Sequence, residues 1–160
     1  NQSINGLMNR LLFNGSNFKW SAHEFPPFNL VVYVATLGSS IVLLGTTLLL
    51  RRKEKANVLD LAFIVLGVSM ASPIAWEHHY AILLPIYALM LKVVLDERGG
   101  NVRWLLALGF SFFLVSQNLG FLNYFRDSVL NVFQSYRLFG AFIALYLLYR
   151  LNAKPHQASA

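Results

Sequence analysis

The sequence contains no cysteine among its 160 residues, which excludes disulfide bonds, thiolate metal sites and a cysteine nucleophile. It also lacks an initiator methionine and the basic and apolar regions of a secretory signal peptide. We therefore expect a C-terminal piece of a longer polypeptide.

Charged residues are scarce, at 12%, whereas hydrophobic residues reach 56% and the mean hydropathy is +0.52. One globular core does not require this much apolar material, so the excess predicts surface that faces lipid. The net charge of +6 comes from short basic runs between apolar segments. This distribution favours membrane topology signals and predicts no nucleic-acid partner.

Apolar runs long enough to approach the roughly 20 residues of a membrane-spanning helix predict about five spans. They cover Phe28 to Leu50, Leu59 to Ile74, Tyr80 to Leu95, Trp104 to Leu119, and Phe133 to Leu151. Their uninterrupted apolar character excludes the alternation of a barrel. The predicted fold class is all-α, a polytopic transmembrane bundle. It divides into an extracytoplasmic interfacial segment (1–27), a transmembrane region (28–151) and a cytoplasmic tail (152–160).

Lysine and arginine accumulate on one side of this predicted bundle. Five spans place Arg51, Arg52, Lys53, Lys55, Lys92, Arg98, Arg103, Arg150 and Lys154 on one side, against Arg10, Lys19, Arg126 and Arg137 on the other. Short cytoplasmic loops retain positive charge during insertion, so the first side is expected to be cytoplasmic.

The same topology gathers polar side chains on the outer face. They are Asn1, Gln2, Asn5, His23, Glu24, Glu77, His78, His79, Gln117, Asn118, Asn123, Arg126, Asp127 and Arg137. They come from the N-terminal segment, the turn around Glu77, the 120–131 loop and the adjoining helix ends. We expect a functional site at this face.

The turn Trp76-Glu77-His78-His79 combines an interfacial aromatic residue with three ionisable groups. Histidine can donate to phosphate, move a proton or bind metal. The spacing lacks the i, i+4 pattern of helical zinc sites, so no metal is predicted. Substrate binding, acid–base chemistry and a plain interfacial anchor remain open. Adjacent histidines diverge by about 100° on a helix, so one of the pair is expected to face a given atom.

Two motifs resemble glycosyltransferase family 87, which contains polyprenyl-phosphate-mannose-dependent α-1,2-mannosyltransferases. The first is Asn1-Gln2-Ser3-Ile4-Asn5-Gly6 followed by Arg10-Leu11-Leu12. The second is Ser72-Pro73-Ile74-Ala75-Trp76-Glu77-His78-His79-Tyr80 followed by Leu83-Leu84-Pro85. Glu77 stands where Asp is equally expected. The two motifs span the first half of the chain, and the last three helices match in hydropathy alone.

The resemblance implies the C-terminal part of a C-type glycosyltransferase fold in a bacterial cell membrane. It implies inverting transfer of a sugar, with mannose expected, from a polyprenyl-phosphate donor to a lipid or glycan acceptor at the extracytoplasmic face. No cofactor is implied. Expected catalytic residues are Glu77, His78 and His79, and expected substrate-binding residues are Asn1, Gln2, Asn5, Arg10, Trp76, Arg126 and Arg137. The usual catalytic aspartate belongs to an upstream loop, so the isolated piece is expected to be inactive.

Each candidate also has a structural interpretation. Arg137 could snorkel from its helix end, Arg126 could form a solvated pair with Asp127, and Arg10 could anchor an interfacial amphipathic helix with Leu7, Leu11 and Leu12. Asn1 and Asn5 could cap that helix. A transporter is the competing function, motivated by short helices with internal proline and glycine, and a scaffolding membrane protein without activity is the third.

Overall fold

The computed structural model describes residues 1–15, 25–49, 57–97 and 99–153, and within these it contains helices and no strand. The α-helices are α1 (Ile4–Leu11), α2 (Leu30–Leu49), α3 (Val58–Ala71), α4 (Leu83–Glu97), α5 (Val102–Ser116) and α6 (Tyr136–Ala153). Short 3-10 helices η1 (Glu77–Ile82), η2 (Gly120–Phe125) and η3 (Val129–Ser135) precede or connect them. The predicted all-α class is confirmed.

All five predicted apolar segments are helical, with boundaries set by local chemistry. The second ends at Ala71 instead of Ile74, because Ser72 precedes Pro73 and adopts an extended backbone with ψ of 132°. The first begins two residues late, at Leu30, where the Asn29 side chain accepts hydrogen bonds from the Val31 and Val32 N–H groups. Asn152 and Ala153, placed in the predicted tail, continue α6.

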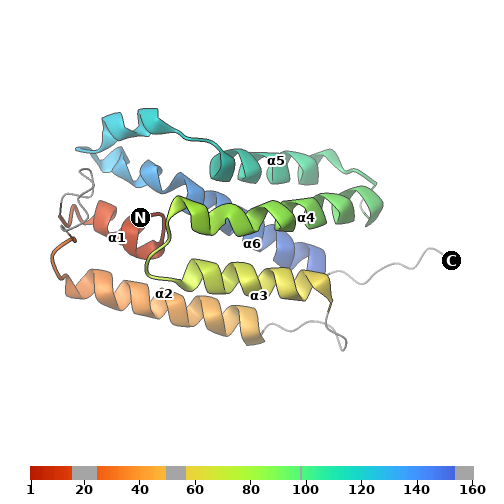
Figure 1. The fold of residues 1–160 in the computed structure, drawn as a ribbon, viewed down its shortest axis with the longest axis horizontal. Helices are drawn as coiled ribbons and strands as arrows, with labels where there is room; N and C mark the ends of the chain where they lie inside the picture. The colour runs from red at the N-terminus through yellow and green to blue at the C-terminus, as the bar shows by residue number, and fades with distance from the viewer. Residues whose placement is uncertain (16–24, 50–56, 98, 154–160) are drawn as a thin grey trace.

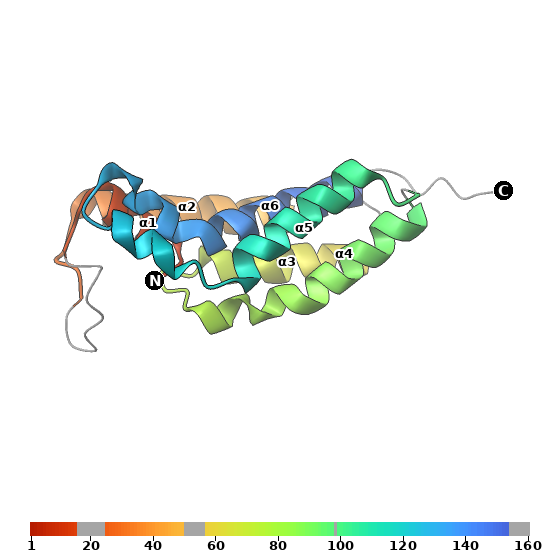
Figure 2. The ribbon, with the colours of Figure 1, turned by 90° about the horizontal axis from the view of Figure 1, so that it is seen from above.

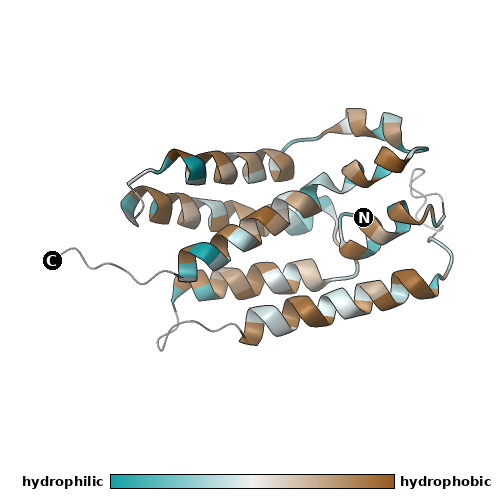
Figure 3. Ribbon diagram, turned by 180° about the vertical axis from the view of Figure 1, so that it is seen from behind, coloured by the Kyte–Doolittle hydropathy of each residue, from teal (hydrophilic) through white to brown (hydrophobic). Residues whose placement is uncertain are grey.

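Among the described residues, three helical segments are long and apolar enough to cross a membrane: Leu30–Leu49, Glu77–Asp96 and Val129–Asn152. Helices α3 and α5 are apolar but shorter, with 14 and 15 residues. At 1.5 Å per residue they extend about 21 to 23 Å, less than the hydrocarbon thickness of about 30 Å. The hydropathy colouring shows mostly apolar helices with polar residues concentrated near their ends (Figure 3).

Helix α6 is the centre of the bundle. It packs against α3, α4 and α5, while α2 lies outside, against α3 (Figure 1). Buried residues Leu138, Ala141, Leu145 and Leu148 form one helical stripe on α6. Gly140 brings α5 close, since an added Cβ would lie 2.7 Å from Val115 Cγ2.

Helix α1 buries polar as well as apolar residues. Asn9 and Arg10 are buried and Ile4 and Leu7 pack against the core, whereas Leu11 at the end of the helix and the following Leu12 and Phe13 are exposed. The structural interpretation in which Arg10 anchors an interfacial helix with Leu7, Leu11 and Leu12 does not fit its burial, because α1 packs against α2 and η3 and Arg10 lies on the buried side. When a helix is surrounded by lipid, its apolar side chains are expected to face outward and its polar side chains to face the protein interior.

Helix α1, η2 and η3 lie together at one end of the bundle, and the α4–α5 connection lies at the other (Figures 1 and 2). The Gln2 N–H donates to the Ala75 carbonyl at 2.7 Å, which joins the N-terminal segment to the turn before η1. The three segments predicted to share one face therefore meet. We call this region the α1 end. The predicted positions Lys19, His23, Glu24, Arg51 to Lys55, Arg98 and Lys154 lie outside the described residues.

Candidate functional site

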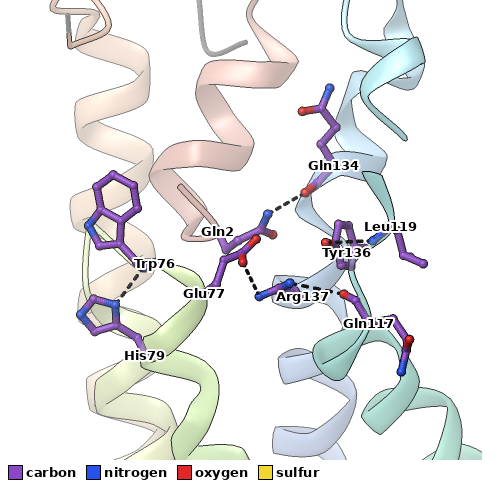
Figure 4. A network of polar contacts seen from close by, with 9 residues as sticks. All are labelled: Gln2, Trp76, Glu77, His79, Gln117, Leu119, Gln134, Tyr136 and Arg137. Carbon is purple, nitrogen blue, oxygen red and sulfur yellow. Dashed lines mark hydrogen bonds and ion pairs between the residues drawn. The ribbon is translucent and has the colours of Figure 1, made fainter. Parts of the chain in front are cut away.

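An ion pair between η1 and α6 lies at the α1 end. Arg137 Nη1 is 3.2 Å from Glu77 Oε2, with the arginine side chain 9% exposed and the glutamate side chain 62% exposed. Arg137 Nη2 also donates to the Gln117 carbonyl at 3.3 Å, and its guanidinium lies 5.6 Å from the centre of the Tyr136 ring. Arg137 therefore links η1, the end of α5 and α6 (Figure 4), instead of snorkelling outward.

The Gln2 side chain anchors the N-terminal segment on η3. Its Nε2 donates to the Gln134 carbonyl at 2.9 Å, and the Tyr80 hydroxyl donates to the Gln2 carbonyl at 2.7 Å (Figure 4 shows the Gln2–Gln134 bond). Gln2 and Tyr80 are both buried. Gln2 therefore lies beside Glu77 and Arg137. We call these three residues, together with the buried polar residues Arg10, Asn131, Gln134 and Ser135 of the α1 end, the polar layer.

Arg10 is a buried cation with a neutral partner. Its Nη1 donates to Ser135 Oγ at 2.8 Å, and the residue is 6% exposed. Within the described chain no carboxylate forms an ion pair with it. Burial lowers the pKa of the Arg10 guanidinium to about 10, with the nearby Tyr136 acting in the opposite direction. Arg10 thus stays charged at neutral pH.

Asn1 and Asn5 make protein contacts. Asn1 Oδ1 accepts from the Ala75 N–H, and its Nδ2 donates to the Pro73 carbonyl. Asn5 Nδ2 donates to Thr36 Oγ1 on α2. Neither caps α1, because Ser3 is the N-cap and accepts from the Gly6 N–H. Both asparagines position the N-terminal segment on its neighbours.

The histidines lie apart from the ion pair. Trp76, His78 and His79 are exposed, and Figure 4 shows Trp76 and His79 on the side of η1 away from Arg137. The Trp76 N–H donates to His79 Nδ1 at 2.9 Å, and the two imidazoles stack with centroids 4.3 Å apart. Since Nδ1 accepts a hydrogen bond, Nε2 is the His79 nitrogen left to donate.

Arg126 lies in the loop after η2 and is exposed. Its Nε is 3.2 Å from Asp127 Oδ2. Both residues line a hollow of about 700 Å³ together with Gly120, Phe121, Asn123 and Tyr124. Arg126 is thus separate from the buried arginines, in the solvated pair that the sequence allowed.

A second, smaller groove of about 240 Å³ runs between η1–α4 and α5. Its lining is mostly apolar and comprises Glu77, Tyr80, Ala81, Leu83, Leu84, Tyr87, Phe112, Val115 and Ser116. Glu77 therefore lies where this apolar groove meets the Glu77–Arg137 ion pair. An apolar groove next to a charged pair is complementary to an amphiphilic molecule, which has an apolar chain and a polar headgroup.

The polar layer contains residues that sequence reasoning missed. Asn131 and Gln134 on η3 are 0% and 8% exposed. They stand in the run Val129-Leu130-Asn131-Val132-Phe133-Gln134, where an i, i+3 amide pair among apolar residues was the available signal. Within the described residues no group of three histidine or acidic side chains could hold a metal ion.

No known protein family, curated protein or solved structure matches the chain. The site must therefore be interpreted from its own chemistry.

Proposed function

We propose that the chain is the C-terminal portion of a membrane glycosyltransferase that uses a polyprenyl-phosphate sugar at the extracytoplasmic face. The observation that carries the proposal is the pair of buried arginines, Arg10 and Arg137, with one ion-pairing carboxylate, Glu77, among the described residues, at the end of a bundle with membrane-length helices. Excess buried positive charge at a membrane boundary suits an anionic lipid headgroup. The family-like motifs supply Gln2, Arg10 and Glu77 to this layer.

The reaction would break the bond between the sugar C1 and the phosphate oxygen and form a bond between C1 and the acceptor oxygen, with inversion. The acceptor proton passes to a carboxylate, either the aspartate expected upstream or Glu77, and one of the histidines, His78 or His79, assists by moving a proton or donating to the phosphate. The departing phosphate keeps the bonding electrons, and Arg10 or Arg137 stabilises its charge. The apolar groove beside Glu77 suits the hydrocarbon chain of the donor. In this proposal five helices span the membrane, and the bilayer is locally thinned around the short helices α3 and α5.

The test is a transfer assay on the complete protein with a panel of polyprenyl-phosphate sugars, mannose first. Arg10→Gln should reduce kcat/KM by about 100-fold or more, because a charged donor to the leaving phosphate is lost. Arg103→Gln, at an exposed arginine near the start of α5, is the matched control and should stay within about twofold. Absence of transfer across the donor panel would argue for a transporter or scaffold instead.

A further inference from the structure

Six buried side-chain atoms at the α1 end lack a hydrogen-bond partner within the described chain. They are Gln2 Oε1, Arg10 Nε, Asn131 Nδ2, Asn131 Oδ1, Gln134 Nε2 and Arg137 Nε. Folded proteins pair nearly all buried polar atoms with protein, water or ligand. These unpaired atoms therefore call for partners beyond the described residues.

Three of these side chains belong to two elements that pack against each other: Arg10 to α1, and Asn131 and Gln134 to η3. Arg10 Nη1 bonds Ser135 Oγ at 2.8 Å, which fixes the guanidinium against η3. Asn131 and Gln134 are three residues apart in a 3-10 helix, where side chains at i and i+3 lie one above the other. Gln2 reaches the same segment through the Gln134 carbonyl, as Figure 4 shows.

The charge balance distinguishes an anion from water as the missing partner. Water can satisfy unpaired amide atoms but supplies no counter-charge. Glu77 is paired with Arg137, and no described carboxylate pairs with Arg10. A buried cation without a counter-ion is unfavourable, and a bound oxyanion supplies both the charge and several acceptor oxygens.

We propose that Asn131 and Gln134, together with Arg10, bind the phosphate of a lipid phosphate. Arg10 Nε, Asn131 Nδ2 and Gln134 Nε2 donate to the phosphate oxygens, while the amide oxygens of Gln2 and Asn131 accept from neighbouring hydroxyl groups of the ligand. The lipid part of this assignment rests on the proposed function, whereas the phosphate part rests on the unpaired donors. Asn131 and Gln134 thus become substrate-binding residues.

The experiment measures the melting temperature of the complete protein in detergent with farnesyl phosphate, inorganic phosphate and uncharged farnesol. Farnesyl phosphate at about 100 times its Kd should raise the melting temperature by roughly 5 to 10 °C. Farnesol should have no effect. Equal protection by inorganic phosphate would support the phosphate site and count against the lipid-linked ligand, whereas no protection by either phosphate would overturn the site.

Asn131→Leu and Gln134→Met replace unpaired amides by apolar groups of similar size. Their unliganded melting temperatures should equal or exceed that of the wild type, because no internal hydrogen bond is lost, and the shift with farnesyl phosphate should disappear. Asn118→Leu makes the same change at an exposed position of the same end and should keep the shift. A retained shift in both buried variants would overturn the assignment. So would a failure of both variants to fold, which would show that the amides are paired within the protein.

Binding and transfer are measured separately, so the two proposals can fail separately. Farnesyl phosphate protection without sugar transfer supports the phosphate site and contradicts the transferase. Transfer with an unchanged donor KM in Asn131→Leu and Gln134→Met supports the transferase and contradicts the site.

Discussion

Arg137 Nη1 lies 3.2 Å from Glu77 Oε2, so a buried arginine at the start of α6 is held by an exposed glutamate of η1. The two residues are 60 positions apart in the chain. The pair ties the Glu77 turn to the central helix and sets its orientation relative to the polar layer.

Removing the carboxylate leaves the buried Arg137 without its counter-charge. We expect Glu77→Gln to lower the free energy of unfolding by about 1 to 2 kcal/mol, less than for a fully buried pair because Glu77 is largely exposed. A double-mutant cycle with Arg137→Gln, followed by thermal unfolding in detergent, measures the coupling. Asp96→Asn, in the exposed Lys92–Asp96 pair, is the control and should change stability by less than about 0.5 kcal/mol. A coupling no larger than this control would contradict the role of the ion pair.

Close packing of α2 on α3 depends on Gly67. An added Cβ there would lie 2.1 Å from Thr47 Cγ2, so Gly67→Ala should destabilise the protein by about 1 to 3 kcal/mol through overpacking. Thr47→Ser removes that methyl group and should restore part of the loss. Gly38→Ala is the matched control, since nothing lies within 4 Å of its added Cβ. It should stabilise helix α2 by about 0.5 to 1 kcal/mol. Unfolding midpoints of Gly67→Ala, of Gly67→Ala combined with Thr47→Ser, and of Gly38→Ala test the packing, and an unaffected Gly67→Ala would be inconsistent with it.

The sequence predicted the helices better than the site. Uninterrupted apolar runs identify α2 to α6 because their hydrophobicity is local information, whereas side-chain direction depends on tertiary packing. Glu77 and Arg137 were both candidates, yet their pairing required α4 to lie beside α6. His79 faces away from that pair because its Nδ1 accepts a hydrogen bond from the Trp76 N–H, at the residue before η1. Asn131 was overlooked because apolar neighbours concealed a buried amide.

Membrane orientation is a prediction that single cysteines can test, because the chain has no native cysteine to mask. We expect position 78 and position 126, at the α1 end, to react with a membrane-impermeant thiol reagent in intact cells. Position 103, at the start of α5, should react after permeabilisation. His78, Arg103 and Arg126 are all exposed, so folding does not limit their reactivity. Labelling at 103 but not at 78 in intact cells would reverse the orientation. Labelling at all three would contradict a membrane-spanning bundle.

His78 and His79 could act in two ways that can be tested separately: by ordering the start of η1, or by contacting the substrate. His79 Nδ1 accepts from the Trp76 N–H at 2.9 Å and so orders the start of η1, where Glu77 is the first residue. Its Nε2 and the whole exposed ring of His78 stay available to a phosphate or an acceptor hydroxyl. An asparagine side chain can supply the acceptor for a backbone N–H but cannot move a proton. His79→Asn therefore keeps the first role and removes the second.

We expect one of the two replacements, His78→Ala or His79→Ala, to lower sugar transfer by the complete protein by about 100-fold to 10,000-fold, the range for a positioned proton-transfer group. Membrane yield should be unchanged, because both rings are exposed and outside the packed core. Transfer and yield are measured separately for the alanine variants and for His79→Asn. If His79→Asn restores the activity that His79→Ala loses, the imidazole acts by ordering η1 and His78 becomes the residue to test for chemistry. If both alanine variants transfer sugar at a normal rate, the histidines are interfacial anchors, and the chemistry of the site depends on Glu77 and the buried arginines.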